Sequence, residues 1–282
     1  MLVAGGLLAT RKLTTRYSQT FTMENGRKTT ALVLSGGVVR GFSHLGVLMA
    51  LENAQVPIDI VTGASVGTII GAAYAAGMNA DTIAGMAGQM NWQHLARPTL
   101  STDGLLSFDR LEVWLTRMFG HLHFEDLAVR FAAIATDMET GRPVVLDSGP
   151  LAPAIRASCS VPGVVEPKEL NGRFLCDGGV SNNLPIDVAR SMGAEYVIAV
   201  DVFQHAPRWP LLGPLGRGLT AVEIMVEHSG GLEGADVLIT PNLSGKTYTS
   251  FGKRDDLVAL GQQAAENYLP TICTDLNLSA NE

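Results

Sequence analysis

Two strand–turn–helix units follow each other near the start of the sequence. The first runs from the apolar segment 31–34 through a glycine-rich turn into a helical pattern over 40–53. The second runs from the mostly β-branched segment 58–61 through the sequence GASVG at 63–67 into a helical pattern that Gly77 can end as a C-cap. Strands that alternate with helices pair in parallel. This arrangement therefore predicts a three-layer α/β/α protein with a mostly parallel central sheet.

The remaining sequence continues this alternation without an internal repeat. We predict further strands at 131–136, 144–146, 173–176, 196–202 and 237–240, and further helices at 82–90, 108–119, 151–157, 186–191, 220–228 and 255–268. Asn171-Gly172 predicts a hairpin turn. Residues 203–218 read as a loop, and Trp209 to Leu212 within it could form an apolar lip over a site, together with Trp92. We expect an N-terminal tail or arm over residues 1–28 and one domain over residues 29–282.

The composition excludes several classes of function. The sequence has 282 residues, of which 17% are charged, and a formal net charge of −7. Such a chain has no broad basic surface, so we expect no nucleic-acid partner. Cys159, Cys176 and Cys273 are widely spaced and odd in number, which indicates free thiols in a reducing, cytoplasmic compartment. Nothing in the sequence has the spacing of metal ligands, and we expect no metal and no cofactor.

No apolar segment reaches the roughly 18–20 residues needed to span a bilayer. Residues 1–9 are apolar, but no basic segment precedes them, so they fit a secretory signal poorly. A short arm that touches a membrane is the alternative to a plain tail, which leaves peripheral membrane contact open. No sequence feature indicates the oligomeric state.

Ser65 occupies the central position of a Gly-x-Ser-x-Gly pattern between a predicted strand and a predicted helix. Small residues on both sides, Gly63 and Gly67, allow a turn tight enough to present the serine oxygen outward, as in a nucleophile elbow. The pattern also arises by chance where a buried strand meets a helix. Other segments must therefore supply a base and a site for an oxyanion.

A glycine-rich turn, SGGVVRG at 35–41, is the candidate for the oxyanion site. Its backbone N–H groups stand at a helix start, where they have no intrahelical partner and the helix dipole favours negative charge. Such a turn could also bind a phosphate. However, the spacing of Gly36, Gly37 and Gly41 does not match a dinucleotide-binding fingerprint, and no P-loop lysine follows. Nucleotide binding is therefore a weak alternative.

The base is harder to assign from residue types. A histidine triad would need a histidine after the acid in the chain, and His205 could serve, whereas His228 lies in a predicted helix. The other candidates lie in or between helices, with no reason to approach Ser65: His94, His121 and His123. Asp177 ends a predicted strand and precedes two glycines, which gives it room to approach another backbone closely. Asp-Gly is also a common turn sequence.

Taken together, these segments resemble the patatin-like phospholipase family. The family pairs a loop of the type Gly-Gly-Gly-x-Arg/Lys-Gly with a Gly-x-Ser-x-Gly elbow and a later Asp-Gly-Gly or Asp-Gly-Ala. Here the three stand in that order as GGVVRG at 36–41, GASVG at 63–67 and DGG at 177–179. The likeness extends to 42–48, 158–167, 182–185 and 193–201, so that it covers roughly residues 30–205, and small bacterial members are the most similar.

The resemblance implies a catalytic Ser65–Asp177 dyad without a histidine. Ser65 would attack an ester carbonyl, Asp177 would act as the general base, and the backbone at Gly36, Gly37 and Val38 would bind the oxyanion. Gly63, Gly67 and Gly178 would support this geometry. The implied substrate is a phospholipid or another acyl ester, and a buried carboxyl with a raised pKa could take the hydroxyl proton.

One residue departs from the family pattern. Val38 replaces the third glycine of the loop, and a β-branched residue tolerates a positive φ badly. Arg40 is retained and would either hold the loop in place or meet an anionic head group, and His44 would pack near the loop. Two rival functions follow: a weakened patatin-fold protein that binds or regulates a partner, favoured by Val38, and an ordinary α/β-hydrolase with a histidine triad. The short gap between Gly37 and Ser65 disfavours the second.

Overall fold

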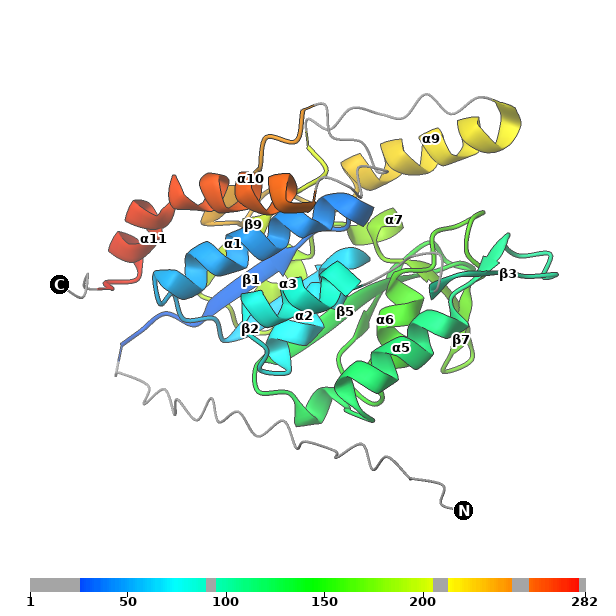
Figure 1. Ribbon diagram of the computed structural model, residues 1–282, viewed down its shortest axis with the longest axis horizontal. Helices are drawn as coiled ribbons and strands as arrows, with labels where there is room; N and C mark the ends of the chain where they lie inside the picture. The colour runs from blue at the N-terminus through cyan, green and yellow to red at the C-terminus, as the bar shows by residue number, and fades with distance from the viewer. Residues whose placement is uncertain (1–25, 90–94, 205–212, 245–253, 279–282) are drawn as a thin grey trace, which may run out of the picture.

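The chain forms a mixed, mostly parallel sheet between layers of helices (Figure 1). The computed structural model describes residues 26–89, 95–204, 213–244 and 254–278. Within these ranges the sheet has eight strands, in the order β10-β9-β1-β2-β5-β8-β7, with β6 paired to β5. The parallel strands are β1 (Thr30–Leu34), β2 (Ile60–Ala64), β5 (Arg130–Asp137), β9 (Tyr196–Val200) and β10 (Val237–Ile239). The antiparallel strands are β6 (Pro143–Leu146), β7 (Lys168–Leu170) and β8 (Arg173–Asp177).

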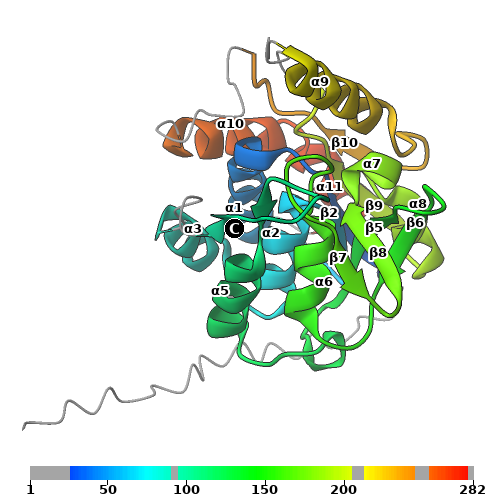
Figure 2. The same cartoon turned by 90° about the vertical axis from the view of Figure 1, so that its right-hand side faces the viewer.

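Helices cover both faces of the sheet. One face carries α1 (Phe42–Asn53), α2 (Val66–Ala75), α3 (Ala80–Gln89), α5 (Asp109–Phe119), α6 (Leu151–Ser158), α10 (Arg254–Glu266) and α11 (Leu269–Asp275), whose apolar side chains share one large core. The other face carries α8 (Ile186–Ser191). The short α7 (Gly179–Asn182) follows β8, and α9 (Gly213–His228) lies against α7 at the edge of the molecule (Figures 1 and 2).

The period-two alternation of β1 explains why the sheet is covered on both sides. Leu32 and Leu34 pack into the core beneath α1 and α2, whereas Ala31 and Val33 pack into a smaller core with Ile186 of α8. All residues of β1 are buried, as expected for a central strand of a parallel sheet. The predicted fold class is therefore confirmed.

Most predicted elements are present, with shifts of a few residues at their ends. The hairpin at Asn171-Gly172 is confirmed, because it joins the antiparallel strands β7 and β8 and both residues have positive φ. The predicted loop over 203–218 is wrong at its C-terminal end, because α9 already begins at Gly213. A small hairpin of β3 (Arg97–Pro98) and β4 (Leu106–Ser107) was not predicted.

Several expectations fall on residues outside the described ranges. These are the tail up to residue 25, Trp92, His94, His205 and the apolar lip at 209–212. Within the described part of the N-terminal segment, Arg27 forms a two-bond ion pair with Asp59, at 2.6 and 2.9 Å. Across the parts of the chain that the structure describes, no helix combines the length and the apolarity needed to cross a membrane.

The strand register brings the two key segments together. Ala64, the last residue of β2, pairs with Ile134 of β5, and Asp177, the last residue of β8, pairs with the next residue of β5, Ala135. Strands β2 and β8 are far apart in the sequence, yet they end beside neighbouring residues of β5. The residue after β2 is Ser65, so the sheet itself delivers Ser65 and Asp177 to one place.

Candidate active site

Ser65 lies on a sharp turn between β2 and α2. Its backbone angles are φ 52° and ψ −126°, a conformation that residues other than glycine rarely adopt. Such strain persists only where the surroundings hold the residue in place, and it is concentrated at functional sites. The turn is therefore a nucleophile elbow in its geometry, as the sequence pattern predicts.

Two side chains hold the backbone of Ser65. Its N–H donates a 3.0 Å hydrogen bond to Oγ of Ser158, the last residue of α6, and Ser158 in turn donates to the carbonyl oxygen of Ile134. Its carbonyl oxygen accepts hydrogen bonds from the N–H of Thr68 at 2.8 Å and from the Thr68 hydroxyl at 2.6 Å. Because its N–H is used by Ser158, Ser65 does not supply an oxyanion donor from its own backbone.

The three glycines expected to support the site allow backbones to approach closely. A Cβ on Gly63 would lie 2.8 Å from the carbonyl carbon of Gly67. A Cβ on Gly67 would collide with the carbonyl oxygen of Leu34, and one on Gly178 would collide with that of Ile134. A side chain at any of these positions would push the elbow or the segment after Asp177 away from the sheet.

Asp177 is a buried carboxyl beside Ser65. Burial raises its pKa from 3.8 to about 6, against the opposing effects of the Ser65 hydroxyl and of a 2.8 Å hydrogen bond from the N–H of Gly179 to Oδ1. Oδ2 accepts no hydrogen bond of ordinary geometry from the described residues. The Ser65 hydroxyl lies close enough to lower the pKa of this carboxyl against the effect of burial, so the two side chains meet at one place.

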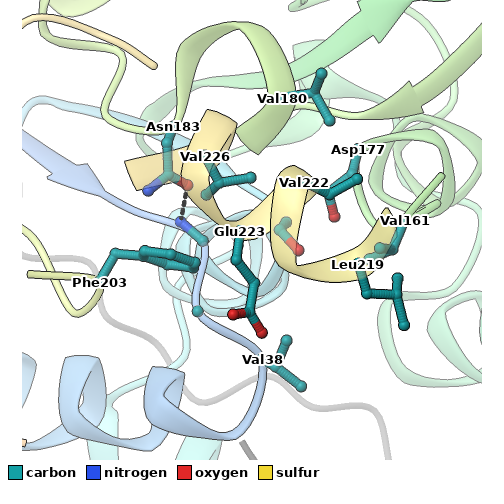
Figure 3. Close-up of a pocket in the computed structure, with 13 residues that line it drawn as sticks. Val38, Val161, Asp177, Val180, Asn183, Phe203, Leu219, Val222, Glu223 and Val226 are labelled. Atoms are coloured by element: carbon teal, nitrogen blue, oxygen red, sulfur yellow. Dashed lines mark hydrogen bonds between the residues drawn. The ribbon is translucent and has the colours of Figure 1, made fainter. Parts of the chain in front are cut away.

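The glycine-rich loop lies against Ser65, and its N–H groups are not equivalent. The N–H of Gly36 donates a 2.9 Å hydrogen bond to Oδ1 of Asn183, drawn as the dashed line in Figure 3. This N–H is therefore already used, which narrows the expected oxyanion donors to Gly37 and Val38. Those two residues begin the 3₁₀ turn at 38–41, where the first N–H groups have no intrahelical partner.

Val38 adopts the positive φ that its side chain resists. Its φ is 51°, so the loop keeps the backbone conformation suited to glycine although a β-branched residue occupies the position. The Val38 side chain is 37% exposed and lines the cavity in front of Ser65. The departure from the family pattern therefore places an apolar side chain in the wall of the site and strains the loop.

Arg40 and His44 are both buried behind the loop. Arg40 is fully buried, with its guanidinium 5.7 Å from the centroid of the Phe203 ring, and it does not line the cavity, so it supports the loop rather than meeting a head group. The ring Nε2 of His44 lies 2.9 Å from the carbonyl oxygen of Ser35. Burial lowers the pKa of His44 to about 4, so its ring is neutral near pH 7 and can donate to that oxygen.

A cavity of about 200 Å³ opens in front of Ser65 and Asp177 (Figure 3). Its lining is largely apolar and consists of Gly36, Gly37, Val38, Ser65, Val161, Asp177, Val180, Asn183, Phe203, Leu219, Val222, Glu223 and Val226. The last four come from α9, which covers the cavity with its inner face. The sequence predicted this helix only from residue 220 and gave it no role.

The described histidines do not approach the site. His44, His121, His123 and His228 are absent from the cavity lining, which removes the local support for a histidine triad from the described ranges. The residues that sequence reasoning missed are Ser158 and Asn183. Both lie in segments already noted for their resemblance to the family, Ser158 at 158–167 and Asn183 at 182–185, but no local pattern indicates which backbone N–H group each side chain binds.

A mostly parallel α/β/α fold with a serine elbow beside a buried Asp-Gly-Gly carboxylate defines a patatin-like protein. The chain belongs to the patatin-like phospholipase family, because residues 32–190 match the model of that family. It is 35% identical over 175 residues to an uncharacterized NTE family protein of Mycobacterium tuberculosis, covering 61% of this chain. It is 30% identical over 292 residues to a lysophospholipase of Neosartorya fischeri, covering 89% of this chain.

A solved structure supports the same fold. The crystal structure of VipD from Legionella pneumophila superposes with a TM-score of 0.65 at 13% identity, over 87% of this chain and 67% of VipD. The two relatives are much longer than this chain. It covers 48% of the mycobacterial protein and 19% of the fungal one.

Proposed function

We propose that the protein is a serine hydrolase of lipid acyl esters that uses Ser65 and Asp177 as a catalytic dyad. One observation carries the proposal: a strained serine turn and a buried carboxyl with a raised pKa meet at an apolar cavity. Perturbed pKa values of this kind are concentrated at catalytic sites. The family and the name of the fungal relative, a lysophospholipase, support lipid esters as the substrate class.

In the first half-reaction, the Ser65 oxygen attacks the ester carbonyl carbon while the ionised Asp177 accepts the hydroxyl proton. A pKa of about 6 makes Asp177 a stronger base than an ordinary aspartate, while it remains mostly ionised near pH 7. The carbonyl oxygen becomes an oxyanion that the N–H groups of Gly37 and Val38 stabilise. The tetrahedral intermediate then expels the alcohol, which takes the proton from Asp177 and leaves an acyl group on Ser65.

In the second half-reaction, water replaces the alcohol. Asp177 accepts a proton from the water as its oxygen attacks the acyl carbon, and the same two N–H groups stabilise the second oxyanion. Collapse of this intermediate breaks the bond to Ser65, whose oxygen recovers the proton from Asp177. The products are a carboxylic acid and the free enzyme, and the cycle uses neither a metal nor a histidine.

A fluorophosphonate probe tests the proposal on the full chain. We expect one adduct, on Ser65. Ser65→Ala should abolish labelling, and Asp177→Asn should lower the rate of labelling at least a hundredfold. His205→Ala tests the alternative of a histidine triad, and the probe should label this variant at the same rate as the unmodified protein. An adduct on another residue, or a loss of labelling in His205→Ala, would contradict the dyad.

The strained Val38 favours a second candidate, a protein that binds an acyl lipid without turning it over. Such a protein would be labelled slowly or not at all and would release no p-nitrophenol from esters of several chain lengths. Val38→Gly separates the two functions. A gain of turnover in this variant would identify the loop as the element that limits a catalytic site, whereas an unchanged absence of turnover would favour the binding function.

A further inference from the structure

A second pocket adjoins the catalytic cavity on the far side of Val38. It has a volume of about 30 Å³ and lies among helices α1, α2, α3 and α5. Val38 lines both this helical pocket and the catalytic cavity, and among the described residues no other is common to the two linings. The two spaces therefore meet at Val38.

The side chains of the described residues that line the helical pocket are aliphatic, aromatic or methionine side chains. Its inner wall is buried and includes Leu45 of α1 and Ile69 and Ala73 of α2. Its outer wall is half-buried and includes Met86 and Ala87 of α3 and Trp114 of α5. Water in a buried site needs two or more polar partners, and among the described lining residues the indole N–H of Trp114 is the one polar side-chain group. The pocket suits an aliphatic chain.

The position of the pocket relative to Ser65 indicates which part of an ester substrate would occupy it. The inner wall belongs largely to α2, the helix that starts directly after Ser65, and Val66 lines the pocket. An ester whose carbonyl carbon lies at Ser65 and whose oxygen meets the N–H groups of Gly37 and Val38 has its acyl chain within reach of the Val38 side chain. The alcohol part can then occupy the catalytic cavity beneath α9, where Asn183 and Glu223 supply polar groups (Figure 3).

We propose that the helical pocket binds the distal end of the substrate's acyl chain and that Val38 is the specificity-determining residue that limits how much of the chain enters. This inference rests on the proposed function and adds the location of the acyl chain. It also gives a physical reason for a β-branched residue in a strained conformation: the side chain forms the wall between the two spaces. Met86 and Met118, which line the helical pocket alone, can adapt its shape, because methionine side chains fill irregular space readily.

Filling the pocket tests the inference. Ala87→Phe places a ring at the outer wall, and Gly85→Phe is the matched control on the same helix, where an added Cβ meets open space. The readout is the ratio of kcat/KM for p-nitrophenyl dodecanoate to that for p-nitrophenyl butyrate. Each methylene kept out of an apolar site lowers binding roughly fourfold. We expect a tenfold lower ratio in Ala87→Phe and a change below twofold in Gly85→Phe.

A variant without the Val38 side chain provides a second test. Val38→Gly joins the two spaces, and we expect it to raise the same ratio at least threefold, whatever it does to the rates themselves. An unchanged ratio in both Ala87→Phe and Val38→Gly would overturn the inference while leaving the proposed hydrolase intact.

A binding measurement decides the inference even if no ester is hydrolysed. Ser65→Ala protein is titrated with 11-bromoundecanoic acid, whose bromine quenches tryptophan fluorescence at short range. We expect saturable quenching that falls by at least half when Trp114→Phe is added, and a weaker affinity when Ala87→Phe is added. Quenching that both additions leave unchanged would overturn the inference. The absence of fluorophosphonate labelling and of turnover would refute the proposed function separately.

Discussion

The N–H of Gly36 donates a 2.9 Å hydrogen bond to Oδ1 of Asn183, and this bond ties the loop beside Ser65 to the segment that follows Asp177. The backbone of Asn183 is itself anchored, because its N–H donates a 3.1 Å hydrogen bond to Oγ of Ser229, which donates in turn to the carbonyl oxygen of Gly179. The glycine-rich loop and the segment that follows Asp177 are thus held together by one side chain.

Removing this side chain should impair catalysis more than stability. Asn183→Ala leaves the buried N–H of Gly36 without a partner, which costs about 1–3 kcal/mol, and lets the loop shift relative to Ser65. Because small displacements of catalytic groups cost up to about a hundredfold in rate, we expect kcat to fall tenfold to a hundredfold. Urea denaturation and ester hydrolysis measure the two effects.

Asn182→Ala is the matched control for that variant. Asn182 is equally buried and donates a 2.8 Å hydrogen bond to Asp187, away from the glycine-rich loop. We expect it to lower stability by a similar amount while changing kcat less than threefold. Equal losses of kcat in the two variants would show that the rate follows general destabilisation rather than the bond to Gly36.

The raised pKa of Asp177 predicts the pH dependence of hydrolysis. Asp177 must be ionised to accept the proton from Ser65, and burial raises its pKa to about 6. We therefore expect kcat/KM to rise with pH through about 6 and then to level off. His44 is already neutral in this range, because burial lowers its pKa to about 4.

Asn183→Asp tests the assignment of this titration to Asp177. The variant keeps an acceptor for Gly36 but adds a negative charge near Asp177, which disfavours ionisation of Asp177. The midpoint of kcat/KM against pH should move to higher pH, by about half a unit or more. His228→Ala, a change at an exposed residue of α9, should leave the midpoint in place. A midpoint that does not move in Asn183→Asp would assign the titration to another group.

The same pKa predicts that Asp177 destabilises the folded protein at neutral pH. The folded protein favours protonated Asp177, so this residue lowers the free energy of unfolding as pH rises from below 3.8 through about 6. The difference between these pKa values corresponds to about 3 kcal/mol at pH 8. Asp177→Asn removes the charge and should stabilise the protein by up to about that amount.

The stabilisation by Asp177→Asn should depend on pH if it comes from the removed charge. Near pH 4, Asp177 is protonated in the folded protein, and the difference in free energy of unfolding between Asp177→Asn and the unmodified protein should become small. Denaturation curves at pH 4 and pH 8 measure it. A difference that is the same at both pH values would trace the effect to packing or hydrogen bonding and not to the buried charge.

The fold and the position of Ser65 were predictable because they depend on local patterns. Alternating strands and helices favour a parallel sheet, and GASVG between a strand and a helix indicates a tight turn at Ser65, although the pattern alone also arises by chance. Asp177 required the resemblance to the family, since Asp-Gly alone predicts only a turn. The meeting of Ser65 and Asp177 depends on the register of β2 and β8 on β5, and no local pattern encodes that register.

The parts of the site that were missed depend on long-range contacts. Ser158 and Asn183 act on backbone N–H groups that lie 93 and 147 residues away in the sequence. The apolar lip expected at 209–212 lies outside the described residues and stays a prediction, whereas the described residues that cover the cavity come from α9, to which the sequence assigned no role. Spacing within α9 predicts a helix with an apolar side, but the surface on which that side packs is determined by the tertiary structure.

The glycines around Ser65 give a final prediction about stability. Gly67→Ala places a methyl group against the carbonyl oxygens of Leu34 and Ser35, at the point where α2 leaves the elbow, and backbone atoms there cannot move without shifting β1. We expect a loss of about 2–4 kcal/mol and of hydrolysis. Gly85→Ala is the control, because its Cβ meets open space on a helix, and it should stabilise by about 0.5–1 kcal/mol. Thermal denaturation compares the two. If Gly67→Ala were as stable as Gly85→Ala, α2 would not require the close approach to β1 that positions the Ser65 turn.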